Sequence, residues 1–109
     1  MVNEQAYDKT QLELAKLGKA LSHPVRIAIL QLLQAQACCY HGDMAEELPV
    51  AKSTLSQHLN ELKAAGLIQG EITPPSVKYC IHKKNWETAG KILNDLFGKL
   101  PLVENCENN

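Results

Sequence analysis

The sequence predicts a single α+β domain that is mostly helical. Two patterns predict this fold: several segments repeat apolar residues at helical spacing, and one pair of alternating segments surrounds Pro74 and Pro75. A length of 109 residues suits one hydrophobic core, and 45% hydrophobic with 21% charged residues is typical of a globular chain. We therefore expect residues 1–109 to form one unit, in the order helix-helix-helix-helix-strand-strand-helix.

Two helices are expected in the N-terminal third. Leucines at spacings of three and four residues predict an amphipathic helix over residues 9–21, with Asp8 as a capping residue. Residues 25–33 are apolar on nearly all sides, which predicts a buried central helix. We expect Ser22 to be the N-cap of this second helix, with Pro24 in its first turn.

Two further helices are expected around a tight turn. Asp43, followed three residues later by a glutamate, resembles a capping box and predicts a short helix over residues 44–48, which Pro49 terminates. A longer helix is expected over residues 51–65, with Gly66 placed for a left-handed C-terminal cap. The helix-turn-helix therefore spans about residues 43–66.

Alternating apolar and polar residues predict a β-hairpin over about residues 67–82. A final helix is expected over residues 84–100, where Pro101 ends it. Although the whole chain has a net charge of −1, four lysines against one glutamate give residues 74–91 a net charge of +3. This basic stretch is either a solvated face or a set of phosphate contacts.

The longer helix of the pair carries a polar stripe opposite its leucines. Hydroxyl and amide side chains can contact phosphates and base edges in the major groove, and the amide of Gln57 can read adenine bidentately, through its oxygen and its NH2 group. Ordinary solvent faces usually hold Lys and Glu pairs, and this stripe holds few. The sequence therefore predicts a winged helix-turn-helix that binds double-stranded DNA, with Lys78 on the wing. The candidate base-edge contacts are Ser53, Thr54, Ser56, Gln57 and His58.

Three segments also resemble a known family. They are Leu21, Ser22, His23, Pro24, Val25, Arg26, Ile27, Ile29 and Leu30, then Gly42, Asp43 and Met44, then Ser53, Thr54, Leu55, Ser56, Gln57, His58, Leu59, Leu62, Ala65, Gly66 and Leu67. With them the chain resembles the ArsR/SmtB repressors over about residues 12–98. The resemblance implies a dimeric sensor of metals, metalloids or thiol oxidants, with Lys52 and Lys63 as phosphate partners. An apolar seam on the last helix also favours a homodimer, made with the first helix.

Adjacent Cys38 and Cys39 are the candidate effector site, because paired thiolates bind thiophilic ions such as As(III) or Sb(III). The third thiolate is expected to be Cys80, with Cys106 as a possibility. The cysteine site of the family falls nearer Gly42, so this arrangement would be a displaced variant. Two alternatives stay open. The cysteines could sense thiol oxidants or persulfides; a disulfide between Cys38 and Cys39 would be strained, so the disulfide partner of either residue would be distant in sequence. Alternatively, the cysteines are inert and pack as small apolar side chains.

Several classes of protein are disfavoured. The sequence contains no phosphate-cradling glycine loop, no His-Glu-x-x-His helix and no ordered nucleophile. It therefore predicts neither an enzyme nor an obligatory cofactor. No apolar run approaches the roughly 18 residues of a membrane span, and the polar start favours the cytoplasm over secretion. We expect His23 to be structural and Arg26 to pair with Glu46 or Glu47. An effector-independent DNA-binding module and a protein-interaction domain are the competing functions.

Overall fold

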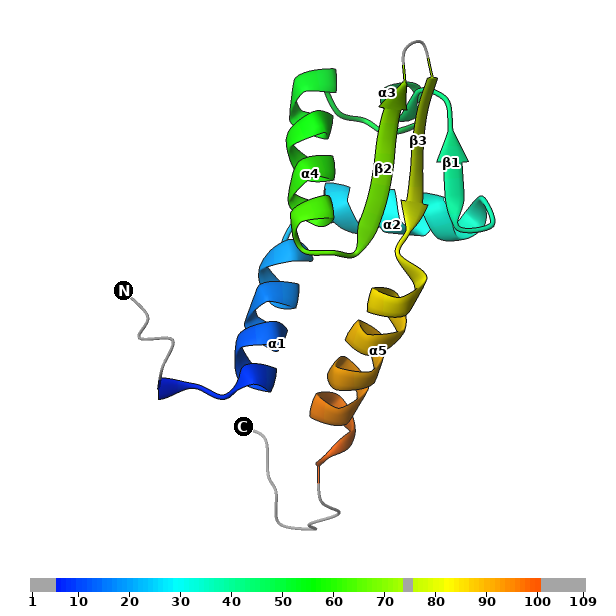
Figure 1. Ribbon diagram of the computed structural model, residues 1–109. Coiled ribbons are helices and arrows are strands. Elements are labelled where there is room, and N and C mark those ends of the chain that lie inside the picture. The colour runs from blue at the N-terminus through cyan, green and yellow to red at the C-terminus, as the bar shows by residue number, and fades with distance from the viewer. Residues whose placement is uncertain (1–5, 74–75, 101–109) are drawn as a thin grey trace.

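The computed structural model describes residues 6–73 and 76–100, shown in Figure 1. The helices are α1 (Lys9–Ala20), α2 (Pro24–Ala35), α3 (Met44–Glu47), α4 (Lys52–Ala64) and α5 (Lys83–Gly98). The strands are β1 (Cys39–His41), β2 (Ile68–Thr73) and β3 (Ser76–Ile81). The predicted fold class, mostly helical with one β-hairpin, is confirmed.

The junction between α1 and α2 differs from the sequence prediction. Asp8 caps α1 as expected, because its carboxylate accepts a hydrogen bond from Gln11 N at 2.8 Å. Ser22, however, is not the N-cap of α2. Its hydroxyl donates to the Lys19 carbonyl at 2.7 Å, so it closes α1, and His23 occupies the N-cap position of α2 without a side-chain bond.

The start of α3 and the end of α4 follow the predicted local signals. The Asp43 carboxylate accepts a hydrogen bond from Ala45 N at 3.0 Å and so caps α3. At the far end of α4, Gly66 has a φ of +81°, a left-handed conformation that glycine adopts without a steric penalty. The Asn85 side chain donates to the Gly66 carbonyl at 2.9 Å, which holds this turn against α5.

The sheet contains one strand that the sequence analysis missed. β1 pairs antiparallel with β3, and the strand order is β1-β3-β2. The register places Cys39 opposite Cys80 and Tyr40 opposite Tyr79. A strand of three residues is too short to show an alternating pattern, and β1 is recognisable only through its pairing with β3.

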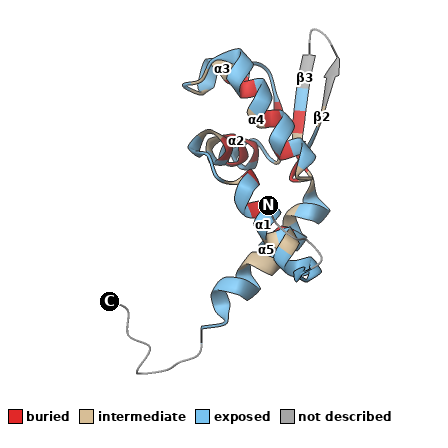
Figure 2. Cartoon of the chain, turned by 90° about the vertical axis from the view of Figure 1, so that its left-hand side faces the viewer, coloured by how far each residue is buried: buried red, intermediate tan, exposed pale blue. Residues whose placement is uncertain are grey.

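The core lies where α2, α4 and the base of the sheet meet. Ile29, Leu33, Leu62 and Ile68 are its largest fully buried side chains. α5 packs against α1 through its first half, whereas its C-terminal half is exposed in Figure 2. Phe97 on that half is 77% exposed and Leu96 is 53% exposed, so α5 presents apolar surface to solvent.

Candidate nucleic-acid interface

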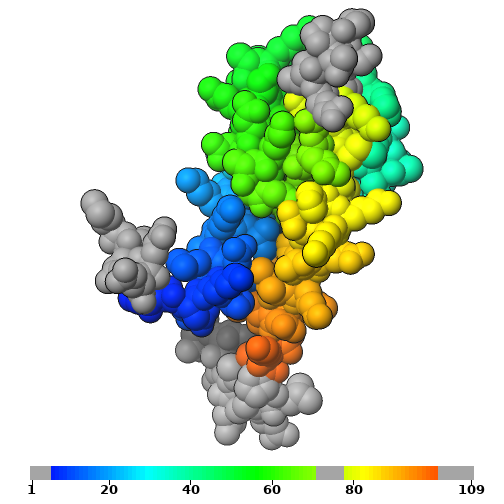
Figure 3. All heavy atoms as spheres, in the orientation of Figure 1, coloured from blue at the N-terminus to red at the C-terminus, as the bar shows by residue number. Residues whose placement is uncertain are grey.

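The exposed face of α4 is set by the leucines on its opposite side. Leu55, Leu59 and Leu62 are buried in the core, which turns the other side of the helix outwards. Figure 3 shows α4, in green, at the molecular surface. The exposed polar residues of α4 that were predicted as base contacts are Ser53, Thr54, Ser56 and Gln57.

Asn60 belongs to the same exposed face and was missed by the sequence analysis. It follows Ser53 by seven residues and Gln57 by three, so the three side chains share one side of the helix. That spacing was readable in the sequence. The amide of Asn60 adds a second group able to pair with adenine.

His58 lies apart from this exposed face, which corrects the predicted stripe. It is half-buried, and its Nδ1 atom accepts a hydrogen bond from Arg26 Nε at 3.0 Å. Its ring centroid lies 5.1 Å from that of His23. Burial lowers the pKa of His58, and the positive charge of Arg26 lowers it further. The neutral imidazole is therefore part of the contact between α4 and α2.

Arg26 joins three helices rather than forming the expected ion pair with Glu46 or Glu47, so that expectation is wrong. The side chain is 7% exposed. Its guanidinium donates to the Lys19 carbonyl at 3.1 Å and to the Ala20 carbonyl at 3.4 Å, in addition to His58. Arg26 thus satisfies the C-terminal carbonyls of α1 and fixes the inner side of α4.

The three lysines predicted to contact DNA have different surroundings. Lys52 Nζ lies 3.7 Å from an Asp43 carboxylate oxygen. Lys63 Nζ donates to the Gly70 carbonyl at 3.2 Å and so joins α4 to β2. Lys78 is exposed on β3. Lys52 and Lys63 therefore each make an intramolecular contact when no DNA is bound.

The cysteines are not arranged as the predicted set of three thiolates. Cys39 and Cys80 form a disulfide, and Cys38 is a free, half-buried thiol that packs against the core. Within residues 6–73 and 76–100, no three His, Cys, Asp or Glu side chains are grouped to hold a metal ion. The fourth cysteine, Cys106, lies outside the described residues. Cys80 was expected near Cys39 as a third thiolate, and any disulfide partner was expected to be distant in sequence. The β-sheet register pairs Cys39 with Cys80, which is 41 positions away.

Tyr40 links β1 to α3. Its hydroxyl donates a hydrogen bond to the carboxylate of Glu47, and the residue is 6% exposed. This hydrogen bond, with burial as the second cause, raises the pKa of Tyr40 to about 12. The phenol therefore remains neutral and able to donate near pH 7.

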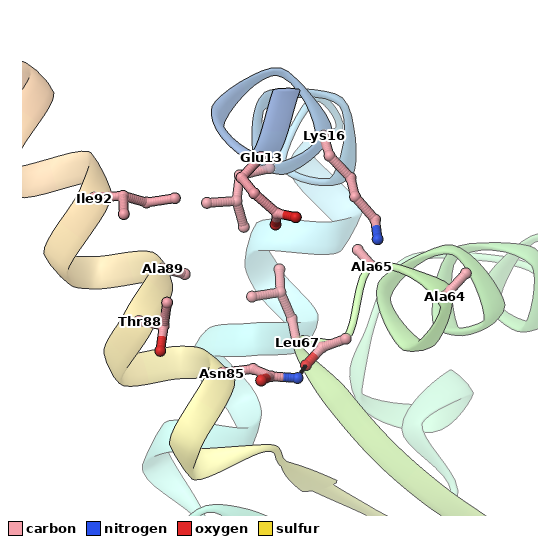
Figure 4. A pocket seen from close by; sticks show the side chains of 11 residues that line it. Glu13, Lys16, Ala64, Ala65, Leu67, Asn85, Thr88, Ala89 and Ile92 are labelled. Atoms are coloured by element: carbon pink, nitrogen blue, oxygen red, sulfur yellow. Dashed lines mark hydrogen bonds between the residues drawn. The ribbon is translucent and has the colours of Figure 1, made fainter. Parts of the chain in front are cut away.

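A partly open cavity of about 210 Å³ lies between α1, the turn after α4 and α5, as Figure 4 shows. Its floor includes Leu67 and Ala89, and Glu13 and Lys16 extend over it from α1. Among residues 6–73 and 76–100, none of those predicted to contact DNA or bind a metal lines it. The cavity is therefore separate from both candidate sites.

The helices α3 and α4, together with the β2–β3 hairpin, define a winged helix-turn-helix protein. A family model described as a helix-turn-helix domain matches residues 21–71. The ArsR-like transcriptional regulator from Rhodococcus sp. RHA1 superposes with a TM-score of 0.67 and 25% identity, over 84% of this chain and 86% of that one.

Two curated relatives come from Mycobacterium tuberculosis. The HTH-type transcriptional repressor SmtB is 45% identical over 65 residues, which are 59% of this chain and 47% of that protein. The HTH-type transcriptional regulator CmtR is 37% identical over 68 residues, which are 62% of this chain and 57% of that protein. The NMR structure of CmtR, described as a cadmium metal-sensor, matches with a TM-score of 0.52 and 29% identity, over 88% of this chain and 95% of that one. The chain spans about half the length of the two curated relatives.

In sequence and in fold the chain is similar to the ArsR/SmtB family of winged helix-turn-helix transcriptional regulators. The resemblance stated from the sequence is thereby confirmed. In the part of the chain that the structure describes, no helix has the length and apolar character needed to cross a membrane.

Proposed function

We propose that this protein is a cytoplasmic, homodimeric repressor that binds double-stranded operator DNA. The observation that carries the proposal is the outer face of α4, where Ser53, Gln57 and Asn60 project from a helix anchored by three buried leucines. Uncharged hydrogen-bonding groups of this kind read base edges, whereas Lys78 on the β2–β3 wing supplies a phosphate contact. We propose no enzymatic activity and no obligatory cofactor.

The apolar end of α5 supports the homodimer. Leu96, Phe97 and Leu100 are all more than half exposed, and a second copy of α5 would remove them from water. A two-fold dimer presents two copies of α4, so we expect a palindromic site with half-sites about 34 Å apart, or a multiple of that distance.

The DNA-binding face is tested by selecting duplexes from a randomised pool and measuring variant affinities for the selected sequence. Gln57→Ala should weaken specific binding by about 1–3 kcal/mol and relax base preference. Lys78→Ala should weaken binding to all sequences and lower the salt dependence by about one counterion. Gln34→Ala removes an exposed amide from α2 and serves as the matched control. If both test variants bind as well as the control, α4 and the wing are not the DNA-binding face.

The effector is proposed to act on the cysteines. In the reduced protein Cys39 and Cys80 are opposite residues of neighbouring strands, so two thiolates are available to one thiophilic ion such as As(III). Cys38 or Cys106 would supply the third ligand. The description of CmtR as a cadmium metal-sensor supports this class of effector within the family.

Thiol redox sensing is a second candidate, favoured by the Cys39–Cys80 disulfide itself. Disulfides in the cytoplasm are usually transient and redox-sensing. With a small disulfide such as glutathione disulfide as oxidant, the two thiols form one S–S bond and release two molecules of reduced glutathione. The two protein sulfurs are oxidised and the glutathione sulfurs are reduced, so the electrons balance.

Separate titrations of the reduced protein on its selected duplex distinguish the two effectors. Arsenite should release DNA from the wild type but not from Cys38→Ser if the metalloid is the effector and Cys38 is its third ligand. Glutathione disulfide should release DNA from both proteins if the disulfide is the effector. Cys39→Ser should respond to neither. Release by arsenite from the Cys38→Ser, Cys39→Ser double variant would eliminate the cysteine site.

A further inference from the structure

Very little chain separates the Cys39–Cys80 pair from the helix-turn-helix. β1 ends at His41, so only Gly42 and Asp43 lie between it and α3. Gly42 has a φ of +118°, a conformation that other residues rarely adopt. The Asp43 carboxylate caps α3. A shift of β1 relative to β3 therefore has only two residues of chain over which to be absorbed before α3 begins.

Tyr40 adds a side-chain connection along the same path. It follows Cys39 directly, its ring is buried, and its hydroxyl bonds to Glu47 at the last turn of α3. The path continues to the DNA-binding helix, because the Asp43 carboxylate lies 3.7 Å from the ammonium group of Lys52, the first residue of α4.

We infer that Tyr40 is the positioning residue that transmits the state of the Cys39–Cys80 pair to the helix-turn-helix, through its hydrogen bond to Glu47. The inference rests on the proposed role of the cysteines as the effector site. In the disulfide form β1 is covalently fixed to β3 next to Tyr40. In the reduced form β1 is held by non-covalent contacts alone, among them its pairing with β3, the burial of Tyr40 and the hydrogen bond from Cys39 N to the Gln36 carbonyl. The Tyr40–Glu47 bond then has different geometry and strength in the two states, which is what coupling requires.

The coupling is limited by the strength of one hydrogen bond to a charged acceptor. We expect the ratio of duplex affinities between reduced and oxidised protein to be at most about 10- to 100-fold. Loss of the Tyr40 hydroxyl should bring that ratio close to one, while the disulfide still forms. A residue that merely stabilises the fold would lower both affinities and leave their ratio unchanged.

The test uses a full chain carrying Cys38→Ser and Cys106→Ser, so that Cys39 and Cys80 are its only thiols. Dithiothreitol gives the reduced form, and glutathione disulfide gives the oxidised form. Thiol titration should confirm the loss of two thiols per chain. Amide hydrogen exchange over residues 44–48 and affinity for the selected duplex are then compared between the two forms.

In this background, exchange over residues 44–48 should differ between the two forms. Tyr40→Phe should abolish that difference, whereas Tyr79→Phe, which removes a buried phenol hydroxyl from β3, should preserve it. Glu47→Ala and Glu46→Ala form a second matched pair on α3, and only the first should abolish the difference. Because Glu47 is exposed, this second pair remains informative if Tyr40→Phe does not fold.

A difference that persists in both Tyr40→Phe and Glu47→Ala, or that is absent before any substitution at these positions, would overturn the inference. Hydrogen exchange is independent of DNA binding. If exchange responds as expected but duplex affinity does not change with oxidation, the inference stands and the proposed effector function fails.

Discussion

Replacing Arg26 with alanine would remove the buried side chain that joins α1, α2 and α4. The guanidinium makes two hydrogen bonds of 3.0 and 3.1 Å and a weaker one of 3.4 Å, and their acceptors lie in a part-buried or buried setting. Hydrogen bonds from a charged donor contribute about 1.5–3 kcal/mol each. Loss of the two shorter bonds is therefore expected to lower the free energy of unfolding by about 3–6 kcal/mol. That is a large part of the roughly 5–15 kcal/mol available to a domain.

Urea unfolding at one fixed protein concentration measures this loss, since a dimer's apparent stability depends on concentration. Arg26→Lys should recover about half of it, because one ammonium group cannot replace the planar fork that reaches His58 and the α1 carbonyls. Gln31→Ala, at an exposed position of the same helix, should change stability by no more than about 0.5 kcal/mol. A loss of less than about 1 kcal/mol in Arg26→Ala would refute the energetic role given to this network.

Three other outcomes are expected. The pKa of His58 is lower in the folded protein, so the unfolded chain binds a proton more readily and the free energy of unfolding should fall as the pH drops below about 6.5. Urea midpoints measured at several pH values should fall less in His58→Gln than in the wild type. Phe97→Glu should convert the proposed homodimer into monomers in sedimentation experiments at micromolar concentration, whereas Asn94→Glu should not. Gly66→Ala should lose about 1–2 kcal/mol in thermal unfolding, because its φ is +81° and a Cβ would lie 2.9 Å from an amide nitrogen; Gly90→Ala, with open space around it, should gain about 0.5–1 kcal/mol.

Local sequence signals predicted most of the fold. The spacing of leucines located the buried side of α4, and Gly66 located its end, because both signals act within a few residues of the chain. Ser22 shows where such a signal is ambiguous. The residue sits between two helices, and its hydroxyl can serve the end of one or the start of the next. In the structure the hydroxyl bonds to the Lys19 carbonyl at the end of α1.

The contacts that depend on distant pairing were predicted only in part: Cys80 was expected near Cys39, but as a third thiolate and not as its disulfide partner. Arg26 was expected to form an ion pair with a carboxylate, yet in the fold it donates hydrogen bonds to two backbone carbonyls and to the ring of His58. Cys39 and Cys80 lie opposite each other because β1 pairs with the hairpin, and a strand of three residues is too short for an alternating sequence pattern to predict it. The candidate DNA face is local to one helix and was largely predicted, whereas the cysteine arrangement depends on tertiary structure.

The shortness of β1 also bears on how the protein behaves in concentrated solution. β1 forms one edge of the sheet and ends after three residues at the turn of Gly42. An edge of that length offers few unpaired backbone groups to a strand from another molecule, and short edge strands are one means by which proteins avoid edge-to-edge aggregation. The strand that brings Cys39 to Cys80 thus aligns three residue pairs with β3 and is too short to template growth of the sheet.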